Sequence, residues 1–329
     1  MNILVYDVAA SESGALSILK EYYAKYANVN DYNKFFFVIS TPKLDNTSNI
    51  TVLRYPWVKK SWLHRVYFDY ICAPKIIKKY KIDRVLSLQN ILLPRTSLSQ
   101  TLYLHQPLPF VDYHFGFFEN TLFWTYQNII GKIIKNSVRK ADKVIVQTKW
   151  MREACVKQCY IHIEKIVVES PQIDKINIKK YVETKDNKIT FFYPATALSY
   201  KNHITLLKAC KIIKDMGIVN YKVILTITGK ENKLARELYE FVQNNDLPVE
   251  FRGVMSSEKV YDMYTKSVLI FPSYIETFGL PLLEGKLSGC PIIAADTVFA
   301  REILDEYRNV SWFQSGDEGK FAELMSNCL

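Results

Sequence analysis

Residues 268–295 read VLIFPSYIETFGLPLLEGKLSGCPIIAA, and this stretch decides the fold. It begins with the apolar run Val268–Pro272 and ends with a second run, Pro291–Ala295, and both are typical of buried strands. Between them Pro281–Ser288 has a helical pattern, and proline suits the first helical turn because its missing N–H costs nothing there. Strand, helix and strand in this order predict two parallel strands joined by a crossover helix.

The same alternation extends outward from this stretch along the rest of the chain. In the second half, strands are also predicted over Ile189–Tyr193, Lys222–Thr228 and Val249–Phe251, and helices over His203–Lys214, Lys233–Asn244 and Glu258–Thr265. In the first half, strands are predicted over Ile3–Tyr6, Phe35–Ile39, Val52–Arg54, Arg84–Leu88, Leu102–His105 and Val144–Gln147. Helices are predicted there over Ala15–Ala27 and Asn120–Asn136, the latter from apolar residues at helical spacing.

A change of composition separates the two halves. Residues Glu169–Lys188 are polar and basic around Pro171 and show no strong periodicity, which is typical of a linker between domains. We therefore predict an α/β protein of two Rossmann-like domains, residues 1–175 and residues 186–329, with parallel sheets facing a cleft. In sheets of this type, ligands bind beyond the carboxyl ends of the strands.

Composition excludes several classes of protein. The 329 residues are 49% hydrophobic and 23% charged, so disorder and collagen-like fibres are excluded. The first residues form no signal peptide, no apolar stretch approaches the length of a membrane span, and six scattered cysteines are typical of reduced thiols, so we expect a cytoplasmic protein. The 43 basic and 33 acidic residues give a net charge of +10, which favours an anionic partner.

The loop inside the opening stretch carries the chemistry. Glu276 and Glu284 lie eight positions apart across the junction between the predicted strand and helix. Gly279 permits close approach of the backbone, and the free N–H groups near Gly279 and Leu280 would form an anion site at the start of the helix. Two carboxylates that accept hydroxyl groups beside a phosphate site suit a sugar joined to a nucleoside diphosphate.

The string from Glu276 to Glu284, ETFGLPLLE, resembles the E-x7-E motif of retaining glycosyltransferases with the GT-B fold, in particular glycosyltransferase family 4, also called glycosyl transferases group 1. This resemblance implies a GT-B fold and a nucleotide-diphosphate sugar as donor, with no further cofactor and no metal ion. It implies that Glu276 orients the donor sugar, that Glu284 binds the ribose, and that the donor is also contacted at Thr277, Phe278, Gly279 and Leu280.

Two further segments of the second half resemble the same family. The segment Tyr193–His203 is similar to the loop that opens the C-terminal domain, where a lysine matched by Lys201 binds the donor diphosphate. An ammonium group at this place would stabilise the charge that develops on the leaving group. Many family members carry an arginine shortly before this lysine, and this chain does not. The segment Phe251–Val254 is similar to the turn whose backbone meets the nucleobase, which implies a donor contact at Val254.

The first half provides two more candidates by the same resemblance. His105 follows a predicted strand, where the family often has a histidine close to the donor sugar, and we expect it to support the reacting centre. The glycine pair that follows the first strand in the family is reduced here to Gly14, followed by Ala15, and we expect Gly14 to let the backbone approach the donor phosphate.

Several other functions are disfavoured by what the sequence lacks. The segment after the first strand is Ser11–Ala15 rather than G-x-G-x-x-G, which argues against a nicotinamide dehydrogenase, and no P-loop lysine motif occurs. No D-x-D triplet occurs, whereas metal-dependent glycosyltransferases of the other major fold use such carboxylates to hold a divalent ion.

Cations and aromatic residues are interspersed in the first half. They gather in Arg54–Arg65, which contains two tryptophans, and in a second basic cluster over Lys132–Lys143. This mixture suits docking on anionic lipid at the inner face of the cell membrane, where a lipid-linked acceptor would lie. No module for binding nucleic acid is recognised, so none is expected as a partner.

These observations predict a retaining, metal-independent glycosyltransferase that moves a hexose-type sugar to a glycan acceptor, as in the biosynthesis of surface polysaccharides such as O-antigen or capsule. Lys201, Glu276 and His105 are its predicted catalytic residues. Two alternatives stay open: a nucleotide-sugar epimerase or phosphorylase on the same fold, and a non-catalytic protein that binds a sugar or nucleotide.

Overall fold

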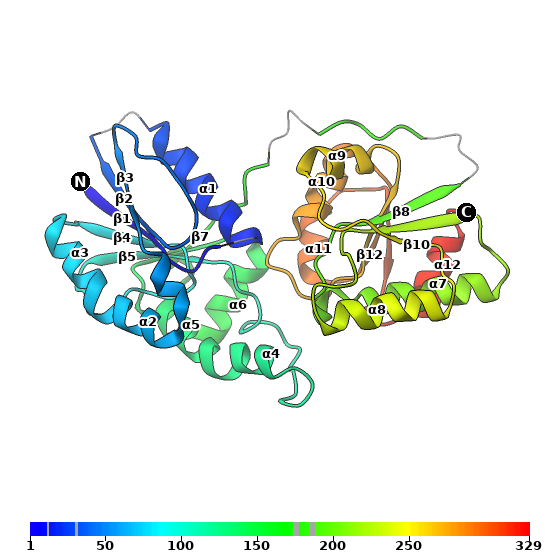
Figure 1. The fold of residues 1–329 in the computed structure, drawn as a ribbon, viewed down its shortest axis with the longest axis horizontal. Coiled ribbons are helices and arrows are strands. Elements are labelled where there is room, and N and C mark those ends of the chain that lie inside the picture. The colour runs from blue at the N-terminus through cyan, green and yellow to red at the C-terminus, as the bar shows by residue number, and fades with distance from the viewer. Residues whose placement is uncertain (12, 30–31, 174–177, 184–187) are drawn as a thin grey trace. The chain divides into compact units, whose positions relative to one another are not determined.

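The computed structural model describes residues 1–11, 13–29, 32–173, 178–183 and 188–329. The chain divides into two compact units, Met1–Gln172 (unit 1) and Ile173–Leu329 (unit 2) (Figure 1). Residues 174–177 and 184–187 of the predicted linker lie outside the described residues. No helix in the described part of the chain is long and apolar enough to cross a bilayer.

Unit 1 is built on a sheet of seven parallel strands in the order β3-β2-β1-β4-β5-β6-β7. The strands are β1 (Asn2–Asp7), β2 (Lys34–Ile39), β3 (Ile50–Arg54), β4 (Arg84–Ser87), β5 (Ser99–Leu104), β6 (Lys143–Val146) and β7 (Ile166–Val168). The register is continuous, with Leu4 opposite Phe36 on β2 and Val85 on β4. Because the strand order reverses between β1 and β4, the loops after these two strands meet at the topological switch point of the sheet.

Helices cover both faces of this sheet. They are α1 (Ser13–Ala27), α2 (Trp62–Tyr67), α3 (Ala73–Lys79), α4 (Thr121–Thr125), α5 (Gly131–Lys140) and α6 (Lys149–Cys159). The helix predicted over Asn120–Asn136 is interrupted, because a π-helical turn over Tyr126–Ile130 joins α4 to α5. Gly131 permits this turn, since a Cβ atom there would meet the carbonyl oxygen of Tyr126 at 2.9 Å.

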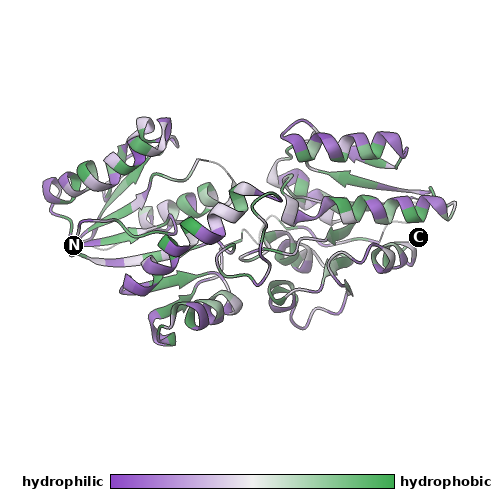
Figure 2. Ribbon diagram, turned by 90° about the horizontal axis from the view of Figure 1, so that it is seen from below, coloured by the Kyte–Doolittle hydropathy of each residue, from purple (hydrophilic) through white to green (hydrophobic). Residues whose placement is uncertain are grey.

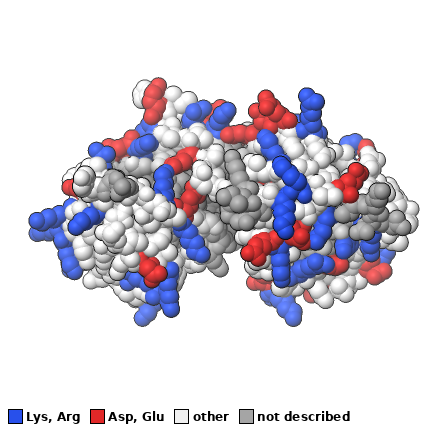
Figure 3. Space-filling view, turned by 90° about the horizontal axis from the view of Figure 1, so that it is seen from above, with Lys and Arg blue, Asp and Glu red and all other residues white. Residues whose placement is uncertain are grey.

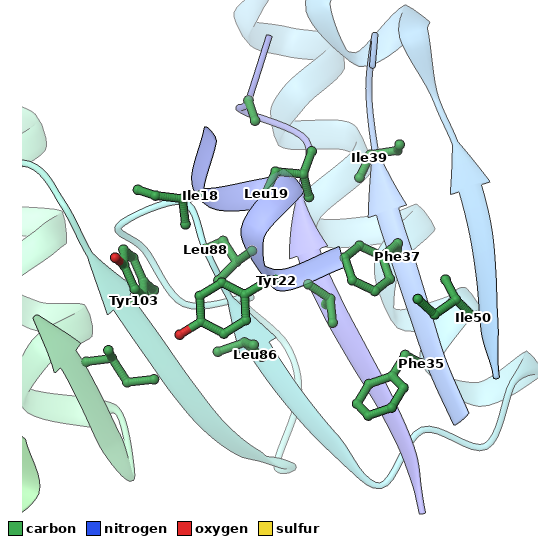
Figure 4. Close-up of a cluster of buried hydrophobic side chains, with 13 residues drawn as sticks. Ile18, Leu19, Tyr22, Phe35, Phe37, Ile39, Ile50, Leu86, Leu88 and Tyr103 are labelled. Atoms are coloured by element: carbon green, nitrogen blue, oxygen red, sulfur yellow. The ribbon is translucent and has the colours of Figure 1, made fainter. Parts of the chain in front are cut away.

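The core of unit 1 follows the alternation of side chains along its strands. On one face α1 packs on aromatic and aliphatic side chains of six strands, with Tyr22 in T-shaped contact with Tyr103 (Figure 4). The opposite face buries Leu4 and Tyr6 of β1 beneath α3 and the turns around it. The strands are accordingly apolar along most of their length, whereas the helices mix polar and apolar residues (Figure 2).

Unit 2 repeats the arrangement with six parallel strands in the order β10-β9-β8-β11-β12-β13. The strands are β8 (Ile189–Tyr193), β9 (Tyr221–Leu225), β10 (Val249–Phe251), β11 (Val268–Phe271), β12 (Ile292–Ala295) and β13 (Val310–Phe313). The helices are α7 (His203–Asp215), α8 (Lys233–Asn244), α9 (Ser257–Tyr264), α10 (Leu280–Ser288), α11 (Val298–Ile303) and α12 (Glu318–Ser326). Helix α7 packs with α8 and α12, and α10 packs with α9 and α11. The switch point of this sheet lies between β8 and β11.

The predicted fold class is confirmed, since each unit is a parallel sheet covered by helices in the Rossmann order. Several predicted strands end earlier than expected: Leu88, His105, Gln147, Pro272 and residues 226–228 follow their strands rather than belong to them. These residues leave the sheet at its carboxyl edge, where parallel strands end together and ligand-binding loops begin. Strands β7 and β13 were not predicted, because both are short edge strands.

Candidate active site

The loops that follow β8 and β11 form a site at the switch point of unit 2. After β8 the chain forms a short 3₁₀ turn, Ser199–Lys201, and reaches α7 through Asn202, which adopts a left-handed conformation with φ of 57°. After β11 the chain runs from Pro272 to Gly279, where α10 begins. The backbone N–H of Tyr274 donates to the carbonyl oxygen of Tyr200 at 3.0 Å, so the two loops are joined directly.

This loop contact brings together two residues that lie 75 positions apart in the sequence. The ammonium of Lys201 forms an ion pair with Oε1 of Glu276, and the side chains are only 18% and 15% exposed. Ser273 Oγ donates a second hydrogen bond to the same carboxylate oxygen at 2.8 Å. The Tyr193 hydroxyl donates to the carbonyl oxygen of Lys201 at 2.7 Å and so fixes the backbone of the lysine. The arrangement sets one positive and one negative group side by side at the end of the sheet.

The N-terminus of α10 borders this ion pair. Gly279 occupies the N-cap with φ of 89°, a left-handed conformation that glycine adopts without steric cost, and no side chain caps the helix. The backbone N–H groups of Gly279 and Leu280 have no acceptor among the described residues. Free N–H groups and the positive end of the helix dipole together favour an anion here. Phe278 is 4% exposed and packs in the core, so only its backbone can reach a ligand.

Glu284 lies one turn into α10 and is separated from this ion pair. Its Oε2 accepts a hydrogen bond from the Tyr264 hydroxyl of α9 at 2.8 Å. Burial raises the pKa of Glu284 to about 7, although the bond from Tyr264 acts in the opposite direction. A carboxyl group with this pKa accepts hydrogen bonds above neutral pH and can also donate one below it.

Val254 lies beside a basic groove of unit 2 and is 94% exposed, so a ligand can reach its side chain and backbone. The groove has a volume of about 540 Å³ and is lined by Lys188, Thr190, Lys222, Ile224, Arg252, Val254, Met255, Ser256, Lys259, Asp262, Met263 and Lys266. Two of these cations are neutralised locally, since Arg252 pairs with Glu250 and Lys266 with Asp262.

His203 is a buried residue of this region to which the sequence assigned no role. Burial, with a smaller contribution from Lys201, lowers the pKa of its imidazole to about 3, so the ring is neutral. It packs against the ring of Tyr193 with centroids 4.8 Å apart, and neither ring nitrogen has a hydrogen-bond partner among the described residues. In the sequence, only its position directly after the Lys201 turn indicated that His203 lies near the site.

His105 and Gly14 belong to unit 1. Nε2 of His105 lies 3.1 Å from the carbonyl oxygen of Leu88, and the backbone N–H of His105 donates to Oδ1 of Asn90 at 2.7 Å. Burial lowers the pKa of His105 to about 4, so the imidazole is neutral and Nδ1 carries a free lone pair when Nε2 donates to Leu88. Gly14 lies in the first turn of α1, and a Cβ atom there would meet nothing within 4 Å.

The structure thus brings Lys201, Glu276 and the first turn of α10 together and places Glu284 deeper on the same helix. In the described part of the chain, no three side chains of His, Cys, Asp or Glu are grouped as ligands for a metal ion. The positive groups that could hold a diphosphate here are the Lys201 ammonium and the N–H groups at the start of α10.

Comparisons with known proteins identify the class. Residues 174–329 match the family model described as "Glycosyl transferases group 1". The O-antigen chain mannosyltransferase RfbU of Salmonella typhimurium is 23% identical over 82% of this chain and 70% of its own length. An uncharacterised 41.2 kDa protein in the cps region of Klebsiella pneumoniae is 23% identical over 52% of this chain and 56% of its own length.

A solved structure supports the architecture. The crystal structure of HepE from Anabaena, in complex with UDP and glucose, is similar with a TM-score of 0.71 at 16% sequence identity, over 100% of this chain and 89% of that one. The two Rossmann units and the site at the β8/β11 switch point define a glycosyltransferase of the GT-B fold, dependent on a nucleotide sugar. Unit 2 belongs to the glycosyl transferases group 1 family.

Proposed function

We propose that this glycosyltransferase transfers a hexose from a nucleotide-diphosphate sugar to the growing glycan of a bacterial surface polysaccharide, with retention of anomeric configuration and without a metal ion. The observation that carries the proposal is the pairing of Lys201 with Glu276 beside the open N-terminus of α10. The type of acceptor follows from RfbU, an O-antigen chain mannosyltransferase, and from the cps-region protein. UDP, which HepE binds, serves as the first nucleotide to test.

Each group of the site has a task in this reaction. The diphosphate of the donor competes with Glu276 for the Lys201 ammonium and accepts hydrogen bonds from the Gly279 and Leu280 amides. These groups stabilise the negative charge that develops on the departing diphosphate, which is the largest electrostatic requirement of the step. The Glu276 carboxylate, released from Lys201, then accepts hydrogen bonds from the donor sugar.

The remaining contacts hold the donor and support the reacting sugar. Glu284 accepts hydroxyl groups of the ribose, and the backbone at Thr277 and Phe278 contacts the diphosphate. The exposed Val254 turn lies against the nucleobase, while Gly14 lets the backbone of unit 1 approach the phosphate. Neutral His105 offers the Nδ1 lone pair to a hydroxyl group of the sugar.

Donor binding and transfer are tested together. We expect a panel of nucleotide sugars, read by thermal shift and by release of free nucleotide diphosphate, to identify one donor. With this donor, Lys201→Ala or Glu276→Ala should lower turnover at least about tenfold, which is equivalent to about 1.4 kcal/mol of activation free energy. Lys211→Ala is a matched control, because Lys211 pairs with Asp215 on the exposed face of α7, away from the ion pair of the site. Unchanged turnover in both folded site variants would contradict the proposal.

A surface of unit 1 supports docking on an anionic membrane, from which a lipid-linked glycan would be taken. Large apolar side chains of α2 are exposed there, among them Trp62 at 69% and Leu63 at 80%. Lys59 and Lys60 precede α2, and each cation near an anionic surface contributes roughly 1 kcal/mol. Figure 3 shows Lys and Arg side chains over both units with Asp and Glu interspersed among them. The proposed location is the cytoplasmic face of the cell membrane.

Vesicle flotation tests this docking surface. We expect the protein to float with vesicles that contain anionic phosphatidylglycerol and not with neutral phosphatidylcholine vesicles, and the double variant Trp62→Ser/Leu63→Ser to lose most of that binding. Val298→Ser is the matched control, since Val298 is 68% exposed but lies on α11 of unit 2. Equal flotation with both kinds of vesicle, or equal loss in the control, would contradict the docking surface.

A further inference from the structure

Unit 1 holds two buried polar side chains that the rest of the structure leaves unsatisfied. Asp7 is 1% exposed and Gln89 is 6% exposed. Oδ1 of Asp7 accepts the backbone N–H of Ala10 at 3.0 Å, but Oδ2 has no partner among the described residues. Neither atom of the Gln89 amide makes a hydrogen bond of ordinary geometry among the described residues, although the amide lies close enough to the Tyr6 hydroxyl to lower its pKa slightly. Buried polar side-chain atoms are nearly always hydrogen-bonded, so each of these exceptions requires an explanation.

Both residues lie at the switch point of the unit 1 sheet. Asp7 is the last residue of β1, and Gln89 follows β4, which pairs with β1 in parallel register. The backbone N–H of Leu88 donates to the carbonyl oxygen of Tyr6 at 3.0 Å, so the two chains stay in contact up to the residues before Asp7 and Gln89. Ligands of open α/β sheets bind at this place, outside the carboxyl ends of the strands where the order reverses.

The charged groups nearest to these two side chains do not satisfy them. The neighbouring Asp69 is already satisfied, since Arg65 binds both of its carboxylate oxygens at 3.0 and 2.8 Å and the Tyr6 hydroxyl donates to it. Asp7 shares no such bond with Arg65. Burial raises the pKa of Asp7 to about 7, although backbone hydrogen bonds from Ala10 and Ala9 and the charges of Arg65 and Lys59 act to lower it.

We propose that Asp7 and Gln89 form a subsite for an uncharged sugar ring of the acceptor glycan, in which Asp7 Oδ2 accepts one ring hydroxyl and the Gln89 amide binds another. This inference rests on the proposed glycosyl transfer and names residues that recognise its acceptor. A carboxylate beside a primary amide offers three acceptor or donor atoms to adjacent hydroxyl groups, which both donate and accept. When Asp7 is ionised it repels an anion, so a neutral hydroxyl group suits this pair better than a phosphate does.

The test uses the full chain and methyl α-glycosides of glucose, mannose, galactose, rhamnose and N-acetylglucosamine as probes, followed by saturation-transfer NMR. We expect the wild type to bind at least one glycoside, and Asp7→Asn and Gln89→Met to bind it at least tenfold more weakly. Gln89→Met removes an unsatisfied buried amide, and Asp7→Asn keeps an oxygen for the Ala10 N–H, so neither should lower the melting temperature. Gln100→Met is the matched control: Gln100 is 7% exposed, but its amide bonds both the N–H and the carbonyl oxygen of Leu93 at 3.0 Å, so we expect a lower melting temperature and unchanged glycoside binding.

The outcomes separate this subsite from the donor site. Asp7→Asn and Gln89→Met should bind the nucleotide sugar as the wild type does. A wild type that binds no nucleotide sugar would contradict the donor site proposed in unit 2, but not the subsite in unit 1. A wild type that binds none of the glycosides, variants that bind them equally well, or a fall in melting temperature that accounts for the lost binding would each overturn the subsite.

Discussion

Glu284 illustrates how burial alone can give one residue a pH-dependent role. Its pKa is raised from the ordinary 4.5 to about 7, so the folded protein holds a proton there that the unfolded chain releases. Between pH 4.5 and pH 7 the native state binds more protons than the unfolded state does. The free energy of unfolding therefore falls as pH rises through this range. The contribution of protonated Glu284 to the free energy of unfolding is complete below about pH 4.5, and it is lost as the pH rises through about 7.

The substitution Glu284→Gln tests this directly. The neutral amide keeps an acceptor for the Tyr264 hydroxyl but cannot ionise. We expect the variant to be more stable than the wild type at about pH 8, by on the order of 1 kcal/mol or more, and the difference to shrink at about pH 5. Urea denaturation at both pH values measures it, and an equal difference at the two would contradict a raised pKa.

At the same scale, the sequence indicated the residues of the candidate site but not their contacts with one another. The string from Glu276 to Glu284 indicated the two carboxylates and the glycine that begins α10, because backbone geometry and residue type suffice for these features. The ion pair with Lys201 could not be predicted, since it depends on how two loops 75 residues apart meet beyond β8 and β11. Asp7 and Gln89 were missed for the same reason, because an unsatisfied atom is visible only when all its neighbours are placed.

At the scale of elements, α10 is held close to the sheet by a glycine. A Cβ atom at Gly285 would meet Leu269 Cδ2 on β11 at 2.7 Å and Cys290 Sγ at 3.2 Å, so either the Leu269 side chain or the helix would have to shift. This position matters because α10 carries the free N–H groups and Glu284.

We expect Gly285→Ala to lower the free energy of unfolding by about 1–3 kcal/mol through overpacking and to weaken nucleotide-sugar binding as α10 moves outward. Gly14→Ala is the control, because open space surrounds that position in α1 and alanine favours a helix by roughly 1 kcal/mol. Chemical denaturation of both variants checks the pair, and a Gly285→Ala protein as stable as Gly14→Ala would contradict the close packing.

Most elements were predictable from periodicity, and the exceptions have physical causes. Helix α8 begins and ends at the predicted residues because Asn232 caps its first turn and its apolar stripe is regular. The π-helical turn between α4 and α5 leaves the apolar spacing of the sequence nearly unchanged, so periodicity alone reads the whole stretch as one helix.

At the scale of the whole molecule, each unit contains its own sheet and its own core. The seven strands of unit 1 and the six of unit 2 pair only within their units among the described residues. We therefore expect residues 1–172 and 173–329, expressed separately, each to unfold cooperatively, and the second to bind the donor nucleotide sugar by itself without transferring the sugar.

Differential scanning calorimetry and a thermal shift with the donor measure these two properties. The Lys201→Ala variant of the isolated second unit should lose the shift, which separates donor binding from unspecific stabilisation. A second unit that aggregates or melts without a cooperative transition would contradict independent folding.

The strand order of unit 1 also bears on how the chain folds during synthesis. Strand β1 lies inside the sheet and needs β4, so it cannot be enclosed until about residue 87 has left the ribosome, and β7 completes the sheet only at residue 168. Among the described residues, no strand of that sheet comes from the later part of the chain. Unit 1 can therefore reach its native state while unit 2 is still being translated, as is general for domains that fold in order of synthesis.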